Sequence, residues 1–318
     1  MATAPSDQRV LVTGGCGYVG TKLTHALLAR GHRVTVLDAM WFGNFLTPHP
    51  LLTMLTQDMR QIDCVDLSGF DTIFHLANIA NDPSVELNPY ASWEVNVLAT
   101  MPLAERAARQ GVAQLVFASS GSVYGVSAEA RVTEDTELCP ISEYNKTKMV
   151  AERVLLSYAG AMVMTIIRPA TVCGPSPRMR LDLTVNLLTM QALTKGIVTV
   201  LGGDQIRPNI HIDDLVDVYL FALDRRLAGV FNAGFENLSV LEIAQRIASR
   251  VPSEVKILPS NDPRSYRQCS DRLLGAGFAP ARNVATAVEE LAALHATGLL
   301  RDDPASHNVS WMKQHNLS

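Results

Sequence analysis

Short apolar runs alternate with longer stretches of helical spacing through the first half of the chain. Apolar residues that cluster between glycines and polar residues predict buried strands, and apolar residues that recur every three to four positions predict helices. The predicted strands span residues 9–15, 33–38, 51–56, 72–77, 114–120 and 162–169, and the predicted helices span residues 18–32, 93–110 and 142–159. Because strands alternate with helices and crossovers are right-handed, we expect a doubly wound, Rossmann-like α/β fold with a parallel sheet.

The pattern changes after Arg168, where the segment TVCGPSPRMR interrupts the alternation with Pro and Arg. Shorter elements follow, which are helices at 183–196, 211–223 and 238–251 and strands at 197–202 and 229–234. We therefore expect a first domain over residues 1–175 and a smaller α/β lobe over residues 176–318. The helix near residues 211–224 can return to the first domain. The polar residues 301–318 are expected to form a surface tail.

Composition and charge exclude several classes of protein. A chain of 318 residues that is 47% hydrophobic and 18% charged can bury a substantial core. Its net charge of −4 does not favour a binder of nucleic acid or of anionic membranes. No apolar run approaches the roughly 18 residues of a membrane helix, and the first eight residues lack the apolar core of a signal peptide.

The cysteines indicate a reducing compartment. Their number, five, is odd, and no C-x-x-C pair occurs. Neither a metal site nor a disulfide framework is therefore expected. We expect free thiols and a cytoplasmic protein.

A glycine loop follows the first predicted strand and opens the first predicted helix. Residues 13–20 read TGGCGYVG, with Gly14, Gly17 and Gly20 three residues apart. Gly14 permits a tight turn, Gly17 lets a pyrophosphate approach the helix N-terminus, and Gly20 allows the helix to pack closely on the strand. Asp38 ends the second strand, where a carboxylate accepts hydrogen bonds from ribose hydroxyls and repels a 2′-phosphate. This context predicts a dinucleotide site that prefers NAD to NADP.

A set of motifs in a fixed order runs along almost the whole chain. They are VLD at 36–38, QDM at 57–59, HLA at 75–77, Asn96, FASSGSVYG at 117–125, Tyr144-x-x-x-Lys148, RPATVCGP at 168–175 and RPNIHIDD at 207–214. With the G-x-x-G-x-x-G loop, these motifs resemble the extended branch of the short-chain dehydrogenase/reductase family, the NAD-dependent nucleotide-sugar epimerases and dehydratases. Residues 176–188 and 262–273 further resemble a subgroup of sugar epimerases and dehydrogenases.

Tyr144 and Lys148 carry the predicted chemistry. They are four residues apart on a predicted helix and therefore share one face. A tyrosine with a pKa near 10 is a poor base at pH 7. The Lys148 ammonium and an oxidised nicotinamide would favour the phenolate, and a shift of about three units corresponds to about 4 kcal/mol. Ser120, at the end of a predicted strand, would orient the reacting sugar oxygen toward Tyr144.

The resemblance implies further binding residues. Arg207 and Arg267 would hold the substrate pyrophosphate, for which a guanidinium is suited, and Ser122 and Asn186 would contact the sugar nucleotide. Arg178 and Arg180 lie in the segment where that ligand is expected. His75 and His211 are assigned structural roles only, and no metal is expected. The residues expected to line the cofactor are Gly14, Gly17, Tyr18, Val19, Gly20, Asp38, Asp58, Met59, Leu76, Ala77, Asn96, Tyr144, Lys148, Pro169 and Val172.

Departures from the family pattern reduce the number of reactions expected for this chain. The 4,6-dehydratases of the family carry Asp and Glu where this chain has Gly121 and Ser122, which disfavours dehydration. Ser122 and Ser176 replace the Cys and His that the fucose-nucleotide reductase uses. Cys173 replaces the usual Tyr, and no role is assigned to it.

The remaining set of NAD, Ser120, Tyr144 and Lys148 suits an NAD-dependent nucleotide-sugar 4-epimerase that forms a transient 4-keto sugar. A nucleotide-sugar 4-dehydrogenase and a 4-ketoreductase are open alternatives, and a non-catalytic NAD-sensing scaffold is an alternative of another class. The nucleotide and the sugar are left open. By family analogy, helices 93–110 and 142–159 would form a homodimer.

Overall fold

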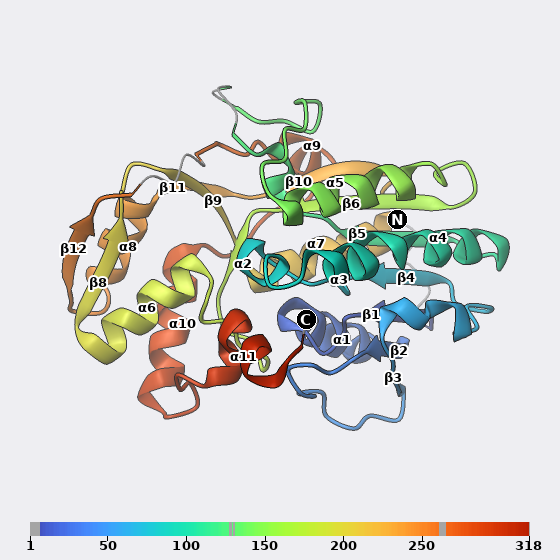
Figure 1. Cartoon of the computed structure of the whole chain (residues 1–318), viewed down its shortest axis with the longest axis horizontal. Coiled ribbons are helices and arrows are strands. Elements are labelled where there is room, and N and C mark those ends of the chain that lie inside the picture. Colours follow the sequence, from blue (N-terminus) through green and yellow to red (C-terminus); the bar gives the residue numbers. More distant parts are fainter. Residues whose placement is uncertain (1–6, 127–128, 130, 261–264, 318) are drawn as a thin grey trace.

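Seven parallel strands form a central sheet in the order β10-β6-β5-β4-β1-β2-β3 (Figure 1). The computed structural model describes residues 7–126, 129, 131–260 and 265–317. All seven were predicted as strands, six of them for this sheet, and the doubly wound α/β fold is confirmed. The strands are β1 (Arg9–Thr13), β2 (Arg33–Asp38), β3 (Leu52–Thr56), β4 (Thr72–His75), β5 (Gln114–Ala118), β6 (Val163–Pro169) and β10 (Gly229–Ala233).

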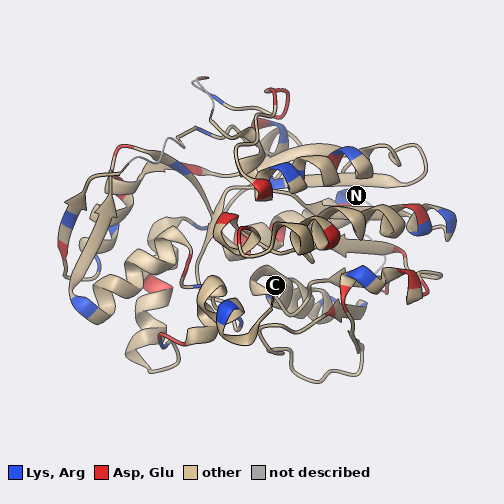
Figure 2. Ribbon diagram, viewed as in Figure 1, with Lys and Arg blue, Asp and Glu red and all other residues tan. Residues whose placement is uncertain are grey.

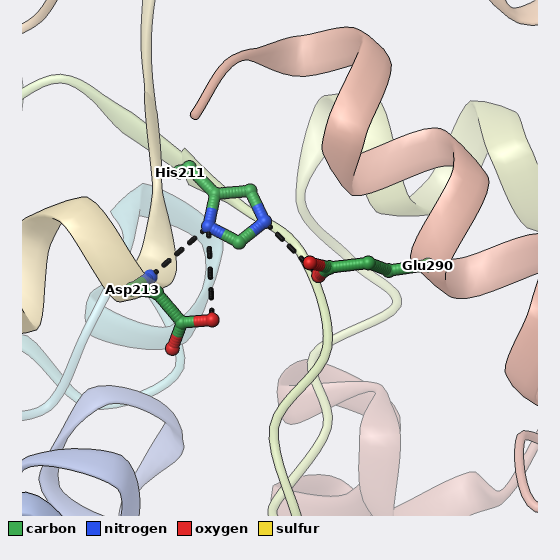
Figure 3. Close-up of side chains that lie close together, drawn as sticks. All are labelled: His211, Asp213 and Glu290. Carbon is green, nitrogen blue, oxygen red and sulfur yellow. Dashed lines mark hydrogen bonds and ion pairs between the residues drawn. The ribbon is translucent and has the colours of Figure 1, made fainter. Parts of the chain in front are cut away.

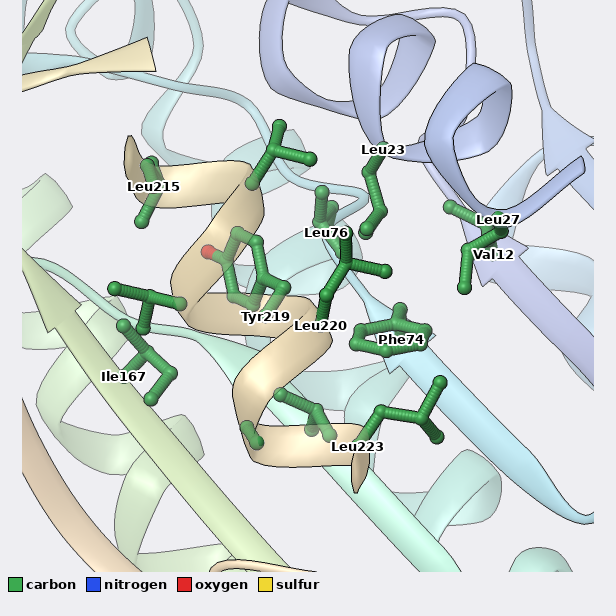
Figure 4. Packing of buried hydrophobic residues seen from close by; sticks show 14 of the residues in the cluster. Val12, Leu23, Leu27, Phe74, Leu76, Ile167, Leu215, Tyr219, Leu220 and Leu223 are labelled. Atoms are coloured by element: carbon green, nitrogen blue, oxygen red, sulfur yellow. The ribbon is translucent and has the colours of Figure 1, made fainter. Parts of the chain in front are cut away.

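Helices cover both faces of this sheet because successive strand residues point to opposite sides. On one face, Val10 and Val12 pack in a core with α1 (Tyr18–Ala29) and α7 (Ile212–Arg225). On the other face, Leu11 packs in a core with α4 (Thr100–Arg109) and α5 (Glu143–Leu156). Figure 4 shows α7 inserted into the first core, with Tyr219 and Leu223 directed at the strands.

The single helix expected over residues 93–110 is broken in the structure. It consists of α3 (Pro89–Trp93), a π-helical turn η2 (Glu94–Leu98) and α4. Pro102 explains the interruption, since it has no N–H to donate to the carbonyl of Leu98. The π-helical turn carries the buried side chain of Asn96 inward.

A smaller lobe packs beside the sheet (Figure 1). Its core lies between β8 (Ile197–Leu201), which pairs with β12 (Glu254–Leu258), and three helices, α6 (Thr184–Lys195), α8 (Val240–Ala248) and α10 (Val284–Ala296). A three-stranded sheet joins this lobe to the first. The remaining elements are β7 (Thr171–Cys173), β9 (Ile206–His211), β11 (Glu236–Ser239), α2 (Asp82–Val85), α9 (Asp271–Gly275) and the turns η1 (Met59–Cys64), η3 (Gly121–Tyr124) and η4 (Pro304–Ser306).

Two elements beyond residue 175 lie on the central sheet. The α7 helix packs against α1, and β10 pairs in parallel with β6, from Gly229 opposite Thr165 to Ala233 opposite Pro169. The sequence placed the strand at 229–234 in the smaller lobe, so its position differs from expectation. β10 therefore extends the sheet beyond β6 and forms its edge. A division of the chain near residue 175 is still a prediction.

The expectation of a surface tail at residues 301–318 is wrong. Residues 308–315 form α11 (Asn308–His315), which lies between the two lobes (Figure 1). Met312 is buried, and the Trp311 indole Nε1 donates a hydrogen bond of 2.8 Å to the carbonyl oxygen of Trp41. A few apolar residues in a polar segment were enough to dock this helix.

Charges of both signs are interspersed over both lobes (Figure 2). Among the described residues, no helix has the length and apolar character needed to cross a bilayer. All five cysteines, each of which the structure describes, are free thiols.

We predict that Leu223→Ala destabilises the protein by about 3 kcal/mol, because it opens a cavity in the core beneath α7. The control is Leu299→Ala at a position that is 78% exposed, where the change should be below about 0.5 kcal/mol. Urea unfolding measures both. Equal effects of the two substitutions would contradict the described packing of α7.

Candidate active site

A cavity of about 580 Å³ opens at the carboxyl ends of five strands of the central sheet. The residues that follow β1, β2, β4, β5 and β6 form its floor, and segments of the smaller lobe at 178–184 and 207–208 form the opposite wall. Ligands bind at this edge of open α/β sheets. The cavity is therefore the candidate active site.

The glycine loop leaves the start of α1 open toward the cavity. Gly14 has a φ of +74°, and a Cβ atom there would lie 2.6 Å from the Ala77 nitrogen. A Cβ atom on Gly20 would lie 2.1 Å from the Gly14 oxygen, so the helix approaches the loop as closely as glycine permits. Gly17 is the N-cap of α1 and offers no side-chain cap. The first N–H groups of α1 are thus available to an anion such as a diphosphate.

Asp38 lies at the end of β2 and lines the cavity. Its Oδ2 accepts a hydrogen bond of 2.9 Å from the Cys16 N–H, and its Oδ1 accepts one of 2.7 Å from the Met40 N–H. Burial raises the pKa of the carboxyl, and the two backbone donors lower it. Each oxygen keeps an acceptor site, and such a fixed carboxylate suits ribose hydroxyls. With the open start of α1, these residues fit a dinucleotide.

Tyr144 and Ser120 both line the cavity, and their side chains share a hydrogen bond. Ser120 shares a hydrogen bond of 2.7 Å with the Ser122 hydroxyl and also accepts one from the Ser122 N–H. Burial raises the pKa of Tyr144 to about 12, while the charge of Arg180 and a hydrogen bond with Ser120 lower it. The protein alone therefore keeps Tyr144 as a phenol at neutral pH.

Lys148 lies one turn after Tyr144 on α5 and is almost fully buried. Its Nζ donates a hydrogen bond of 2.7 Å to the carbonyl oxygen of Ala118 and lies 4.7 Å from the centre of the Phe117 ring. Burial lowers its pKa to about 7, and the charge of Glu152 opposes that shift. The amine is thus held in one position and has further N–H groups for a ligand.

From the sequence, Lys148 and an oxidised nicotinamide are expected to favour the Tyr144 phenolate together, and that expectation stays a prediction. In the structure, the groups that lower the pKa of Tyr144 are Arg180 and Ser120. Burial lowers the pKa of Lys148 to about 7, so its charge would act on Tyr144 at neutral pH only with a ligand that favours the ammonium.

A buried ion pair behind Lys148 was not predicted. Glu152 lies one further turn along α5 and pairs with Arg168 of β6 at 2.7 Å, with both side chains at most 5% exposed. The Ser119 hydroxyl donates to the same carboxylate. The spacing of Tyr144, Lys148 and Glu152 at four residues each is the signal that could have revealed this group.

Most of the predicted site residues line the cavity, and three do not. Asn96 is buried and braces the loop after β4 through the backbone of Ile79. Asn186 is buried and accepts from the Gly174 N–H, and Arg267 is exposed outside the cavity. Binding roles for these three stay predictions. Those that line the cavity are Gly14, Gly17, Tyr18, Val19, Gly20, Asp38, Asp58, Met59, Leu76, Ala77, Ser120, Ser122, Tyr144, Lys148, Pro169, Val172 and Arg207.

Residues 262–264 of the second family-like segment lie outside the described residues. They are the first three residues of the string at 262–273, so the structure does not describe that part of the resemblance.

His211, Asp213 and Glu290 form a cluster outside the cavity (Figure 3). The His211 Nδ1 accepts from the Asp213 N–H at 3.1 Å, so its Nε2 carries the hydrogen and donates to Glu290 at 3.1 Å. Burial lowers the pKa of this imidazole. Both ring nitrogens thus have hydrogen-bond partners, and the group joins the start of α7 to α10 as a structural brace.

Comparison with known proteins identifies the family. Residues 10–234 match the NAD dependent epimerase/dehydratase family. The chain belongs to this family. It is therefore an NAD-dependent enzyme of the nucleotide-sugar epimerase, dehydratase and decarboxylase type, and its cofactor is NAD.

Individual relatives carry different activities. The chain is 28% identical over 268 residues to a UDP-glucose 4-epimerase of Lactobacillus helveticus, covering 75% of this chain and 81% of the relative. It is 30% identical over 278 residues to UDP-glucuronic acid decarboxylase 1 of Danio rerio, covering 82% of this chain and 66% of the relative. The structure of MoeE5 in complex with UDP-glucose and NAD matches 92% of this chain and all of that chain, with a TM-score of 0.80 and 27% identity.

We predict that Lys148→Met stabilises the cofactor-free protein. Burial lowers the pKa of Lys148 from its ordinary 10.5 to about 7, so the folded state binds fewer protons than the unfolded state between these pH values. The penalty is full below pH 7 and vanishes as the pH rises above 10.5. We expect a gain of about 2 kcal/mol at pH 6, less than the full shift is worth because Ala118 loses its donor.

Denaturant unfolding at pH 6 and pH 10 measures this difference. Lys146→Met is the matched control, since Lys146 pairs with Glu143 at the surface of the same helix. A Lys148→Met protein that is less stable than the parent at pH 6 would show that the buried ammonium carries no penalty.

Proposed function

We propose that the protein is a nucleotide-sugar 4-epimerase. The observation that carries the proposal is the placement of Tyr144, Ser120 and Lys148 along the cavity that also holds the glycine loop and Asp38. This set is sufficient to oxidise a secondary alcohol and to reduce the resulting ketone. The UDP-glucose 4-epimerases among the relatives support the same reading.

Tyr144 is the proposed acid–base group. The Ser120 hydroxyl holds the C4 oxygen of the sugar, and the Tyr144 oxygen takes its proton as the C4 hydrogen leaves with its electron pair. NAD, held by the glycine loop and Asp38, would supply the hydride acceptor and donor for this exchange. Tyr144 then gives its proton back to the same oxygen after the 4-keto sugar has turned to present its other face. The oxidation at C4 and the later reduction at C4 cancel within one turnover. Turnover therefore needs no added oxidant.

Lys148 and Arg180 prepare Tyr144 for this step. Lys148 would donate to the nicotinamide ribose with the N–H groups that Ala118 leaves free. Arg180 lies in the cavity wall, and its charge favours the phenolate form of Tyr144. With a ligand that keeps Lys148 charged, Lys148 and Arg180 together would lower the pKa of Tyr144 more than either alone.

The substrate contacts belong to the proposal as well. Ser122 and Arg207 line the cavity and suit a sugar hydroxyl and a diphosphate, respectively. Roles for Asn186 and Arg267 require movement of these side chains and stay predictions. Gly121 and Ser122, which follow Ser120 directly, provide no carboxyl group for the elimination of water.

We predict that Tyr144→Phe abolishes turnover, with kcat at least 10³-fold lower, and leaves NAD bound, because only the proton-transferring oxygen is removed. The assay incubates UDP-, GDP-, dTDP- and CDP-hexoses with the protein and separates the epimers by chromatography. Tyr90→Phe, at an exposed position on α3, is the control and should keep full activity.

The products distinguish the alternatives. A free 4-keto sugar that accumulates with stoichiometric reduced cofactor would indicate a 4-dehydrogenase, and turnover of 4-keto sugars alone would indicate a 4-ketoreductase. A parent protein that binds NAD and converts no nucleotide sugar would support the non-catalytic scaffold. Retained epimerisation in Tyr144→Phe would refute Tyr144 as the acid–base group.

The same proposal includes a homodimer in the cytoplasm. Tyr90, Leu98 and Met101 are 73%, 54% and 47% exposed, and they lie on the consecutive elements α3, η2 and α4. A helical face with three large apolar side chains in water favours self-association. The free thiols are consistent with a reducing compartment.

We predict that light scattering gives twice the chain mass of 34.6 kDa. Met101→Glu should shift the protein toward the monomer, because it places a charge on the proposed contact. Ile257→Glu, at an exposed position of β12 away from α3 and α4, is the control. A parent protein of monomer mass would contradict the dimer.

A further inference from the structure

Two arginines on one wall of the cavity have different electrostatic surroundings. Arg180 makes two hydrogen bonds of 2.9 Å with the Asp182 carboxylate, and its charge reaches Tyr144. Arg178 has no carboxylate within ion-pair distance among residues 7–126, 129, 131–260 and 265–317. Only Arg180 is therefore neutralised by a carboxylate of the protein itself.

The guanidinium of Arg178 is buried and incompletely bonded. Its side chain is 3% exposed, and its Nη1 and Nη2 donate to the Met179 oxygen at 3.2 Å and to Asn308 Oδ1 at 2.6 Å. The plane lies 4.1 Å from the centre of the Phe42 ring. Its Nε is buried without an acceptor in the described part of the chain. Buried cations are ordinarily paired, so this arrangement is incomplete without an anion.

The position of Arg178 is on the cofactor side of the cavity. The Ser176 hydroxyl donates to the Tyr18 oxygen at 2.7 Å, and the Tyr18 hydroxyl donates to the Gly174 oxygen at 2.6 Å. These bonds fasten the segment before Arg178 to the first residue of α1. The charge of Asp38 also acts on Arg178. Arg178 therefore lies near the open N-terminus of α1 and the end of β2.

A diphosphate is the anion that fits this place. The N–H groups at the start of α1 attract phosphate oxygens, and a guanidinium adds a charge-assisted hydrogen bond from the opposite wall. Arg178 faces the cavity that contains both features.

We propose that Arg178 binds the diphosphate of NAD and that Asn308 of α11 holds it in place. The proposal rests on NAD binding, not on the proposed epimerase reaction. The substrate is also expected to carry a diphosphate, and Arg207 lies in the cavity for that ligand. The test must therefore separate the cofactor from the substrate.

The experiment uses full-length protein stripped of cofactor and calorimetry with NAD, ADP-ribose and UDP. We expect Arg178→Gln to weaken NAD and ADP-ribose binding by about 10- to 100-fold, the effect of one charge-assisted hydrogen bond. UDP binding should stay within twofold of the parent. The control is Arg250→Gln. Arg250 pairs with Glu289 at the surface of the smaller lobe, away from the cavity, so this variant should change none of the three affinities.

Two further variants keep the test decisive if Arg178→Gln does not fold. Arg178→Lys retains the charge and should lose less NAD affinity than the glutamine variant. Asn308→Ala keeps the Arg178 side chain but removes the hydrogen bond that positions it, and it should weaken NAD binding about 3-fold and reduce the rise in Tm that NAD causes. NAD affinity within twofold of the parent in all three variants would overturn the proposal. Weaker UDP binding with unchanged NAD binding would assign Arg178 to the substrate.

Discussion

The burial of the Lys148 amine is the constraint on which the site depends. A lysine in this position lies against a ring and a backbone carbonyl, and its pKa falls to about 7. Such a group is costly for folding, and the adjacent Glu152–Arg168 pair supplies the charge that limits the cost. The same burial fixes the amine within one helical turn of Tyr144, where a bound ligand can change its protonation.

The two faces of the central sheet explain how this placement is achieved. The α5 helix presents Tyr144, Lys148 and Glu152 on one face because they recur every four residues, and the ends of β5 and β6 meet them there. On the other face, α1 and α7 hold the glycine loop at the same edge of the sheet. The reacting group and the phosphate loop thus come from opposite layers and meet only at the carboxyl ends of the strands.

The features that the sequence predicted are local in the chain. The glycine loop, Asp38 and the Tyr144–Lys148 pair each depend on a spacing of a few residues, which fixes a turn or a helix face. The features that it missed join distant segments. Arg178 bonds to Asn308 across 130 residues, and no local pattern carries that contact.

The elements that were not predicted have the same explanation. The strands β7 and β11 have three and four residues, and both pair with β9, which lies between them. The α11 helix is polar by composition, and it is ordered by contacts of Trp311 and Met312 with distant residues. The intrinsic secondary-structure propensity of a segment does not predict an element that forms only through packing against distant residues.

Internal return of one hydrogen distinguishes a 4-epimerase from a 4-dehydrogenase and a 4-ketoreductase. The most direct measurement follows a nucleotide sugar that the enzyme converts, deuterated at C4, in ordinary water with catalytic amounts of protein. In the proposed reaction Tyr144 moves only the hydroxyl proton, so NMR should find the deuterium retained at C4 in both epimers. Loss of the deuterium to water during conversion would contradict hydride return in a closed site with Tyr144 as the acid–base group.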